Sequence, residues 1–535
     1  MKRTLLVLAI IAFSGLTFGQ HWITQGLGWS TTSRGVMNVF ATSSTVAWAG
    51  GYDGSGGSAA CQDVAVTTDG GTTWTPHVIS GASGLSVSMI TAIDENTAWA
   101  AMYKVSGSNL QGVYKTTDGG ATWARQGTSS MYTASASFPD CLYFFDANNG
   151  CAIGDPISGK FEIYTTGDGG TTWTVVDPTT LPAITTGEAG WTVDCGASGS
   201  NIWFGTNKGH VYRSADKGLT WTAAAIPNMT GKNTWPAFKD ANNGFCMKFY
   251  STTDTLGLLA GSTDGGVTYT AATYGGSLYN NQLTFVAGTA STWVSSGVDA
   301  TNQPNRVGLA YSFDDGANFN AVDPDLQGTQ VTCETSFNDS VMYAGSFSTG
   351  TTDGIFVCHV PVVAAVANFT SNTQAVAKGG QIIYTNTSTG IATSPCTYLW
   401  TFQGGTPATS SSKNPPVVTY NTSGTFNVTL KVSNAFGSVN SLVKTGYVYV
   451  GGVGVDEISE SGIKVYPNPV KDILNVETGS NIQMIQIFNV AGQLVINKQL
   501  DSKTASVNTS SLKAGIYMLK VTTENATIER KVVVQ

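Results

Sequence analysis

Thr67-Thr68-Asp69-Gly70-Gly71-Thr72-Thr73-Trp74 is the stretch that decides how most of this chain folds. Five edited copies follow it: Thr116–Trp123 (TTDGGATW), Thr166–Trp173 (TGDGGTTW), Ser214–Trp221 (SADKGLTW), Ser262–Tyr269 (STDGGVTY) and Ser312–Phe319 (SFDDGANF). Their aspartates are Asp69, Asp118, Asp168, Asp216, Asp264 and Asp314, separated by 49, 50, 48, 48 and 50 residues. A fixed period near 50 indicates a repeat architecture.

Each copy has the chemistry of a tight turn followed by an anchor. The aspartate can accept hydrogen bonds from amides of its own loop, and glycine supplies positive φ without a steric penalty. The closing aromatic residue brings a large apolar surface to bury. The pattern resembles the Asp-box, or BNR repeat, which lies between the third and fourth strands of β-propeller blades. This resemblance implies a structural role for the six aspartates and leaves function open.

A second motif, a small residue and an aromatic entering a short apolar strand, precedes most boxes by roughly twenty residues. Its aromatic positions are Trp48, Trp99, Trp203, Phe245, Trp293 and Tyr343, and Cys151 takes the place in the third unit. Each unit therefore reads as four short strands with a box between the last two. Four short strands in about fifty residues are typical of a propeller blade.

Seven units carry the second motif, but only six carry a box. The last unit, Val331–Val360, provides three strands, and the segment Trp22–Trp29 stands where its fourth strand belongs. We expect these two segments to pair, because pairing closes the ring and protects the sheet edges. The sequence thus predicts an all-β fold that begins with a seven-bladed propeller over residues 20–361. Six or eight blades are the alternatives.

Composition fits an exported β-rich protein. Of its 535 residues, enough for several domains, only 11% are charged. Residues 1–19 have the basic start and short apolar run of a cleaved secretory signal, and no later stretch is long enough to span a membrane. Without Lys2 and Arg3 the chain holds 24 basic and 34 acidic residues, a net charge of −10. This acidic balance argues against nucleic acid as a partner.

The cysteines and histidines do not predict a metal site. The eight cysteines form no C-x-x-C motif, and the four histidines do not cluster. We therefore expect no metal and no cofactor. Export permits disulfides, and Cys141 and Cys151 could face each other across a hairpin. Cys333 and Cys358 share one unit. The pairing stays open, with buried free thiols as the alternative.

Asp-boxes also occur in sialidases, where three arginines hold the substrate, a Tyr–Glu pair attacks and an aspartate serves as acid/base. The propeller has four arginines: Arg125 and Arg213 adjoin boxes, Arg306 lies in a loop, and only Arg34 opens an inner strand. Most of its acidic residues lie in turns. Other glycosidases need a pair of carboxyl groups at one site. We expect no catalytic residues, with a secreted glycosidase, sialidase-like or other, as the alternative.

Ligand binding is the function that the propeller favours. Propellers usually bind ligands at the loops that lead into the inner strands. The residues that open those strands here are Arg34, Tyr132, Trp191, Trp235 and Tyr279. Aromatic rings around a funnel could stack on sugars or peptide side chains. We expect a glycan or a surface protein as the partner. Packing within the ring is the alternative for each residue, and an assembly or stability factor is the alternative for the protein.

Residues 364–450 predict a small β-sandwich. Trp400 and Tyr420 supply core aromatics, and Gly424–Val432 alternates apolar and polar residues like a half-buried strand. The segment resembles a PKD domain, an immunoglobulin-like sandwich. The W-x-F-G-D-G motif of that family stands here as Trp400–Gly405 (WTFQGG), without its aspartate. The resemblance implies a spacer or adhesion module.

Residues 456–535 predict a second β-sandwich, with period-two strands separated by Gly and Asn turns. The segment resembles the type A C-terminal sorting domain of the type IX secretion system. The matching residues are Tyr466, Pro467, Asn468, Pro469, Gly492, Gly515 and Tyr517. The resemblance implies recognition by the outer-membrane translocon and cleavage by a sortase-like protease. We expect a monomer that crosses the periplasm and is released or displayed on the cell surface.

Overall fold

A computed structural model describes residues 21–127, 131–249, 257–298, 307–321, 325–326, 328–348, 350–391, 396–451 and 463–535. The predicted signal, residues 1–19, and Arg306 lie outside these residues. All regular elements in the described ranges are strands. The chain divides into two compact units: residues up to 374 with 381–419 and 425–448, and residues 375–380, 420–424 and 449–535.

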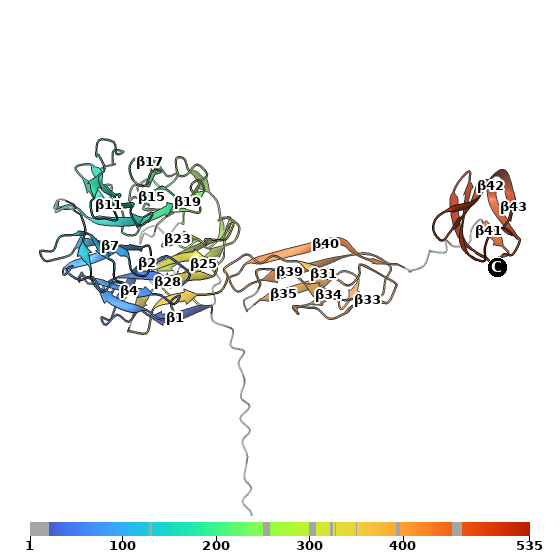
Figure 1. The fold of residues 1–535 in the computed structure, drawn as a ribbon, viewed down its shortest axis with the longest axis horizontal. Helices are drawn as coiled ribbons and strands as arrows, with labels where there is room; N and C mark the ends of the chain where they lie inside the picture. Colours follow the sequence, from blue (N-terminus) through green and yellow to red (C-terminus); the bar gives the residue numbers. More distant parts are fainter. Residues whose placement is uncertain are drawn as a thin grey trace, which may run out of the picture. The chain divides into compact units, whose positions relative to one another are not determined.

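Seven antiparallel sheets of three to five strands, and one two-stranded ladder, form the propeller among the described residues between 22 and 358 (Figure 1). The first three sheets contain β2 (Arg34–Ala41), β3 (Ala47–Asp53), β4 (Asp63–Thr67) and β5 (Thr75–Val78); β6 (Leu85–Ala92), β7 (Ala98–Lys104), β8 (Gly112–Thr116) and β9 (Ala124–Arg125); and β10 (Pro139–Phe144), β11 (Gly150–Ile157), β12 (Lys160–Thr166) and β13 (Thr174–Val175).

The next three sheets contain β14 (Cys195–Ser198), β15 (Asn201–Gly205), β16 (His210–Ser214) and β17 (Thr222–Ala225); β18 (Thr234–Phe238), β19 (Gly244–Lys248), β20 (Leu259–Ser262) and β21 (Thr270–Ala272); and β23 (Gln282–Phe285), β24 (Trp293–Val298) and β25 (Val307–Ser312). A short parallel ladder joins β22 (Gly275–Gly276) to β26 (Asn318–Phe319). Neighbouring strands within each sheet run antiparallel, as chain order predicts for a blade.

The two ends of the propeller segment meet in the seventh sheet. Its strands are β27 (Cys333–Asn338), β28 (Val341–Gly345), β30 (Gly354–Cys358) and β1 (Trp22–Gly26). Strand β1 pairs with β30 along its whole length, from Trp22 opposite Cys358 to Gly26 opposite Gly354. The predicted pairing of the N-terminal segment with the last unit is confirmed. A further strand, β29 (Phe347–Ser348), pairs with β2 and links the last sheet to the first.

The same hydrogen bonds stabilise the turn in all six boxes. The opening Ser or Thr hydroxyl lies 2.7–2.9 Å from the aspartate Oδ1, and the second glycine donates its N–H to that hydroxyl at 2.8–3.0 Å. The residue four positions after the aspartate donates its N–H to Oδ1 at 2.8–2.9 Å. These bonds lie within each turn, whereas the first glycine position donates its N–H outside the turn, as Gly70 does to the Thr45 carbonyl at 2.8 Å.

The boxes lie apart from one another, each at the end of its own sheet. Asp69, for example, lies between β4 and β5, and Asp314 lies between β25 and β26. The hydroxyl and N–H of Thr122 lower the pKa of Asp118 to about 2, and Thr268 does the same for Asp264. A carboxyl group that accepts several hydrogen bonds in its charged form stays ionised. The carboxylate of each aspartate thus makes its hydrogen bonds within its own turn.

The second glycine of each box also fixes how neighbouring sheets pack. Its φ lies between 83° and 92° in all six copies. A Cβ atom there would lie 2.5–3.3 Å from the second-motif residue of the preceding sheet: Tyr343, Trp48, Trp99, Cys151, Trp203 and Phe245 in turn. Lys217 and Asp315 replace the first glycine, with φ of 60° and 57°, so the first position accepts a side chain. The second position leaves no room for one.

The eight cysteines are free thiols. Strand register explains why the hairpin pair suggested by the sequence does not form. Cys141 lies opposite Ile153, and Cys151 lies opposite Tyr143. Burial raises the pKa of the Cys151 thiol because the charged thiolate loses its hydration.

The PKD segment forms sheets with its predicted aromatics in the core. The larger sheet has the order β32 (Ala375–Val376), β40 (Val439–Val450), β39 (Gly424–Ser433), β35 (Thr397–Phe402) and β37 (Thr409–Ser410). The smaller sheets are β33 (Gly380–Ile382), β38 (Val418–Tyr420) and β36 (Gly405–Thr406), and β31 (Phe369–Ser371) with β34 (Tyr384–Asn386). Trp400 and Tyr420 are fully buried. Gln403, near the missing aspartate, accepts the Asn427 N–H at 3.0 Å.

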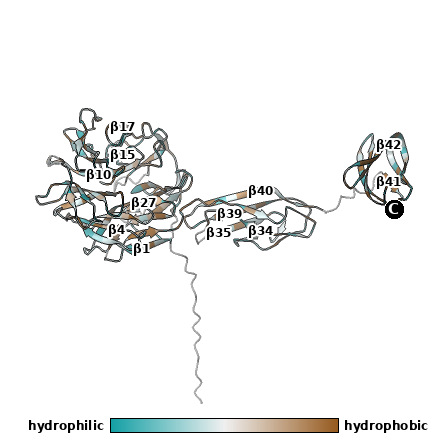
Figure 2. Ribbon diagram, in the orientation of Figure 1, coloured by the Kyte–Doolittle hydropathy of each residue, from teal (hydrophilic) through white to brown (hydrophobic). Residues whose placement is uncertain are grey.

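The C-terminal domain is a sheet with the order β41 (Ile463–Tyr466), β42 (Ile473–Asn489), β44 (Gly515–Thr523) and β45 (Thr527–Val534), and β43 (Leu494–Asn508) also pairs with β42. Buried and less buried residues alternate along β42 and β44, and the buried aliphatic side chains form one cluster. Figure 2 shows both hydrophobic and hydrophilic colours along the ribbons of this domain. Asn468 covers the outer edge of β45. It donates to the Lys531 carbonyl at 2.9 Å and accepts the Val533 N–H at 2.8 Å.

Candidate functional site

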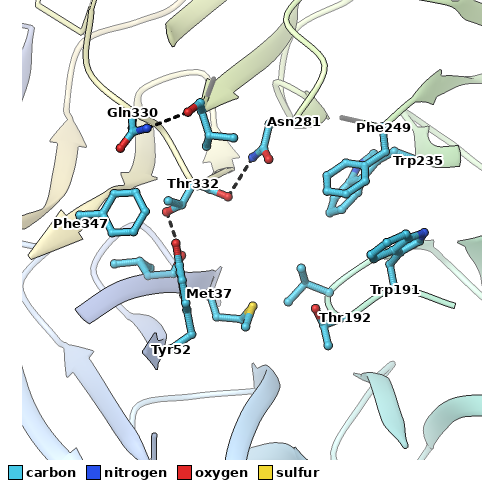
Figure 3. Close-up of a pocket in the computed structure, with 13 residues that line it drawn as sticks. Met37, Tyr52, Trp191, Thr192, Trp235, Phe249, Asn281, Gln330, Thr332 and Phe347 are labelled. Carbon is cyan, nitrogen blue, oxygen red and sulfur yellow. Dashed lines mark hydrogen bonds between the residues drawn. The ribbon is translucent and has the colours of Figure 1, made fainter. Parts of the chain in front are cut away.

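A cavity of about 400 Å³ lies where the inner ends of five propeller sheets converge (Figure 3). Strands β2, β3, β18, β24 and β29 contribute to it, together with the segments that lead into β14, β23 and β27. Its lining residues are Val36, Met37, Tyr52, Trp191, Thr192, Val193, Trp235, Phe249, Asn281, Val298, Gln330, Thr332 and Phe347. The volume falls in the range of about 300–1,000 Å³ that is usual for small-molecule sites.

Three aromatic rings form one wall of the cavity. The Trp191 and Trp235 rings each lie 5.7 Å from the Phe249 ring, centroid to centroid. Trp235 stacks on Phe249 at 29° and is mostly buried, whereas Trp191 is 36% exposed. Tyr52 and Phe347 meet edge to face on another side at 6.0 Å. Figure 3 shows these two groups facing the same hollow.

Two amide side chains reach the cavity between the aromatic groups. The Asn281 Nδ2 donates to the Thr332 carbonyl at 3.0 Å, and the Gln330 Nε2 donates to the Val298 carbonyl at 2.8 Å (Figure 3). These bonds orient both amides. Each side-chain oxygen stays available to accept a bond from a ligand, because Asn281 and Gln330 make no other bonds that use it among the described residues.

One half-buried carboxylate and one backbone amide hold the segment that carries Trp191. The Asp155 carboxylate accepts the Gly190 N–H at 3.0 Å, and the Asp194 N–H is donated to the Trp191 carbonyl at 3.3 Å. Burial raises the pKa of Asp155, and it raises the pKa values of Asp140 and Asp194 further. None of these three carboxyl groups lines the cavity. Of the three, the Asp155 carboxylate is the positioning residue, because it accepts the N–H next to Trp191.

The structure divides the five predicted ligand-binding residues into two groups. Trp191 and Trp235 line the cavity. Arg34, Tyr132 and Tyr279 do not line it and are 8%, 2% and 1% exposed. For these three, the structure favours the packing alternative.

Each of the three buried residues has a structural partner. Arg34 is bound to Asp63 at 2.7 Å and lies 3.8 Å from Asp53. Tyr132 packs edge to face on Tyr164, and Tyr279 belongs to a buried cluster between sheets. Opening an inner strand therefore does not by itself place a side chain in the funnel.

Three cavity aromatics were missing from the predicted set: Tyr52, Phe249 and Phe347. Each stands four residues after a second-motif aromatic, namely Trp48, Phe245 and Tyr343. Tyr52 lies on the same strand as its motif aromatic and, because side chains alternate, on the same face. Phe249 directly follows β19, and Phe347 opens the next strand, β29. An aromatic at that offset is the sequence signal that could have found them.

A second cavity, of about 340 Å³, shares Val193 and Trp235 with the first. Glu334 of β27 lines it and is 2% exposed. Burial raises the pKa of Glu334 to about 8, although the Ser296 and Thr284 hydroxyls oppose the shift. Glu334 is therefore mostly protonated at neutral pH. Among the described residues, no cluster of three or more His, Cys, Asp or Glu side chains could hold a metal ion.

Family models identify the two C-terminal domains. Residues 367–445 match the PKD domain, and residues 464–535 match the secretion system C-terminal sorting domain. Both matches lie within the ranges that the sequence predicts. The sorting domain indicates export and attachment at the cell surface. The described residues include no helix that could cross a membrane.

Solved structures similar to this chain contain β-propellers. YCF48 from Cyanidioschyzon merolae is 15% identical, over 63% of this chain and 99% of its own, with a TM-score of 0.44. The GH74 xyloglucanase from Xanthomonas campestris is 10% identical, and the match covers 95% of this chain and 87% of the xyloglucanase, with a TM-score of 0.41.

Trypanosoma rangeli sialidase in complex with a difluorosialic acid is 12% identical, over 92% of this chain and 94% of its own, with a TM-score of 0.35. No curated protein matches this chain in sequence. At these identities and scores, the similarities carry no argument about function.

Proposed function

We propose that the protein is a cell-surface binding or adhesion protein, and that the axial cavity of its propeller binds a glycan or a protein. The observation that carries this proposal is the composition of the cavity. Five aromatic rings and four neutral polar side chains converge on a hollow of ligand size. Concave sites lined by apolar rings with a few polar groups are the usual form of small-ligand sites.

The domain order supports the same role. The sorting domain takes the chain to the cell surface, where a binding propeller meets external ligands. The PKD domain between them serves as a spacer in this proposal. Partners at the export step are the translocon and its sortase-like protease. We expect deletion of residues 465–535 to leave the protein in the periplasm, and cell fractionation checks this. Normal surface display of the deleted form would contradict the export role of this domain.

Glycoside hydrolysis is the second function to consider, because it needs two carboxyl groups across the scissile bond. No Asp or Glu is among the described residues that line the cavity. Asp155 lies behind the Trp191 segment, where it accepts the Gly190 N–H. This arrangement favours binding over catalysis.

A retention assay tests the proposal with the full chain. The protein is incubated with immobilised polysaccharides and with surface-protein extracts, and both retention and release of reducing sugar are measured. We expect retention without hydrolysis, and its loss in Trp191→Ala. Phe337→Ala is the matched control because Phe337 is also 36% exposed and lines none of the described cavities. Hydrolysis that depends on Asp155 would replace the binding proposal by the enzymatic one.

A further inference from the structure

The residues that line the cavity indicate the chemical class of its ligand. This inference rests on the binding function proposed above. Its most accessible ring, Trp191, offers a flat apolar face. Phe249 packs against this ring at 5.7 Å, and Trp235 in turn stacks on Phe249, so the three rings form one continuous wall (Figure 3). Pyranose rings present an apolar face of C–H groups, which packs well on an aromatic ring of this kind.

The polar groups of the cavity are matched to hydroxyl donors. Asn281 and Gln330 each donate from the side-chain NH₂ group to a backbone carbonyl, and their side-chain oxygens accept no bond among the described residues. Thr332 likewise donates its hydroxyl to the Val36 carbonyl at 2.8 Å. A ligand that brings hydroxyl groups satisfies these acceptors. An apolar peptide side chain in the same place would leave them without partners, at a cost in affinity.

The lack of charged side chains in the cavity lining favours a neutral ligand over an acidic one. None of the described lining residues is charged. Arg34 lies on the strand that supplies Val36 and Met37, but Asp63 and Asp53 already occupy its guanidinium group. An acidic sugar would therefore lose the hydration of its carboxylate without gaining a counter-charge.

We propose that this cavity binds an uncharged saccharide, with one sugar ring stacked on Trp191 and its hydroxyl groups bonded to the side-chain oxygens of Asn281 and Gln330. The proposal combines three features of one hollow: the exposed ring, the free acceptor oxygens and the absence of charge among the described lining residues. Binding of such a ligand has little dependence on ionic strength, because no ion pair forms.

Isothermal titration of the full chain tests this assignment with defined ligands. Cellohexaose, mannohexaose and laminarihexaose represent uncharged saccharides. Tetragalacturonate and 3′-sialyllactose represent acidic ones, and an aromatic-rich hexapeptide represents the protein alternative. We expect at least one uncharged hexasaccharide to bind, with a Kd that changes less than about twofold between 0.15 and 1 M NaCl. Trp191→Ala should weaken it at least about tenfold, Trp191→Phe less, and Phe337→Ala not at all.

The outcomes separate this inference from the function on which it rests. Binding confined to the acidic sugars, or to the peptide, overturns the saccharide assignment while the binding function stands. Binding of an uncharged saccharide that Trp191→Ala leaves unchanged overturns the assignment of this cavity. If none of the six ligands binds, both the assignment and the binding function fail.

Discussion

Gly218→Ala is the substitution that most sharply tests how the boxes hold neighbouring sheets together. A Cβ atom at Gly218 would lie 2.5 Å from the Cys151 Sγ and 3.0 Å from the Cys151 Cβ, at a φ of 92°. Cys151 is fully buried, so it cannot move aside freely. Overpacking a core costs about 1–3 kcal/mol, and a side chain at positive φ costs about 1–2 kcal/mol more. We expect a loss of about 2–5 kcal/mol in the free energy of unfolding.

Gly119→Ala is the matched control. Gly119 also has positive φ, 71°, but a Cβ there would meet only the Glu95 carbonyl at an ordinary 3.5 Å. It should cost only the conformational part, about 1–2 kcal/mol. The double variant Gly218→Ala/Cys151→Ala removes the Sγ atom, so Gly218→Ala should cost less in that background than in the wild type.

Urea unfolding followed by tryptophan fluorescence measures these differences. Twelve of the 13 tryptophans lie in the propeller, and only Trp400 lies outside it, so the signal reports chiefly on the propeller. Equal losses for Gly218→Ala and Gly119→Ala would refute the steric reasoning. The reasoning would also be refuted if Gly218→Ala cost as much free energy of unfolding in the Cys151→Ala background as in the wild type.

The titration of Glu334, the titration of the box aspartates and the outer edge of β45 each give a further prediction. Because the folded pKa of Glu334, about 8, lies above its unfolded value, its stability contribution is present below about pH 4.5 and is lost as the pH rises to 8. Unfolding free energies measured from pH 5 to 8 should therefore fall, by at most about 1.4 kcal/mol per pH unit from this group, and Glu334→Gln should flatten the slope. Asp118 and Asp264 have folded pKa values of about 2, below their unfolded values, so their contribution is present above pH 4 and lost towards pH 2. Urea midpoints should drop over that interval, and less so in Asp118→Asn; midpoints independent of pH there would count against the box bonds. Asn468→Ala removes two hydrogen bonds to β45 and should cost about 1–2 kcal/mol, seen as faster amide exchange at the Val533 N–H; unchanged exchange there would mean that Asn468 does not cover this edge.

The propeller scaffold was largely predictable because its signals are local and repeated. A box carries its turn, its hydrogen-bonding aspartate and its anchor within eight residues, so each copy can be read alone. Ring closure by β1 was predictable from a missing strand in the last unit. The requirement for the second glycine could not be read in the same way, because the contact that forbids a side chain comes from the preceding sheet.

The cavity was predictable only in part. Trp191 and Trp235 were found because they stand ahead of inner strands, but Arg34, Tyr132 and Tyr279 share that feature and are buried. Whether a lead-in residue faces the funnel depends on partners from distant segments, such as the Asp63 carboxylate that binds Arg34. Such pairings depend on the folded geometry, so sequence position alone did not separate the two groups.

Stability and ligand retention, measured together on Asp168→Ala and Trp191→Ala, separate the scaffold from the site most directly. Asp168 accepts the N–H and the hydroxyl of Thr172 at 2.8 and 2.6 Å, and it lines none of the described cavities. We predict that Asp168→Ala lowers the unfolding midpoint and leaves retention per folded molecule unchanged, whereas Trp191→Ala abolishes retention with little change in the midpoint. Loss of retention in a fully stable Asp168→Ala protein would contradict the division into structural boxes and a binding cavity.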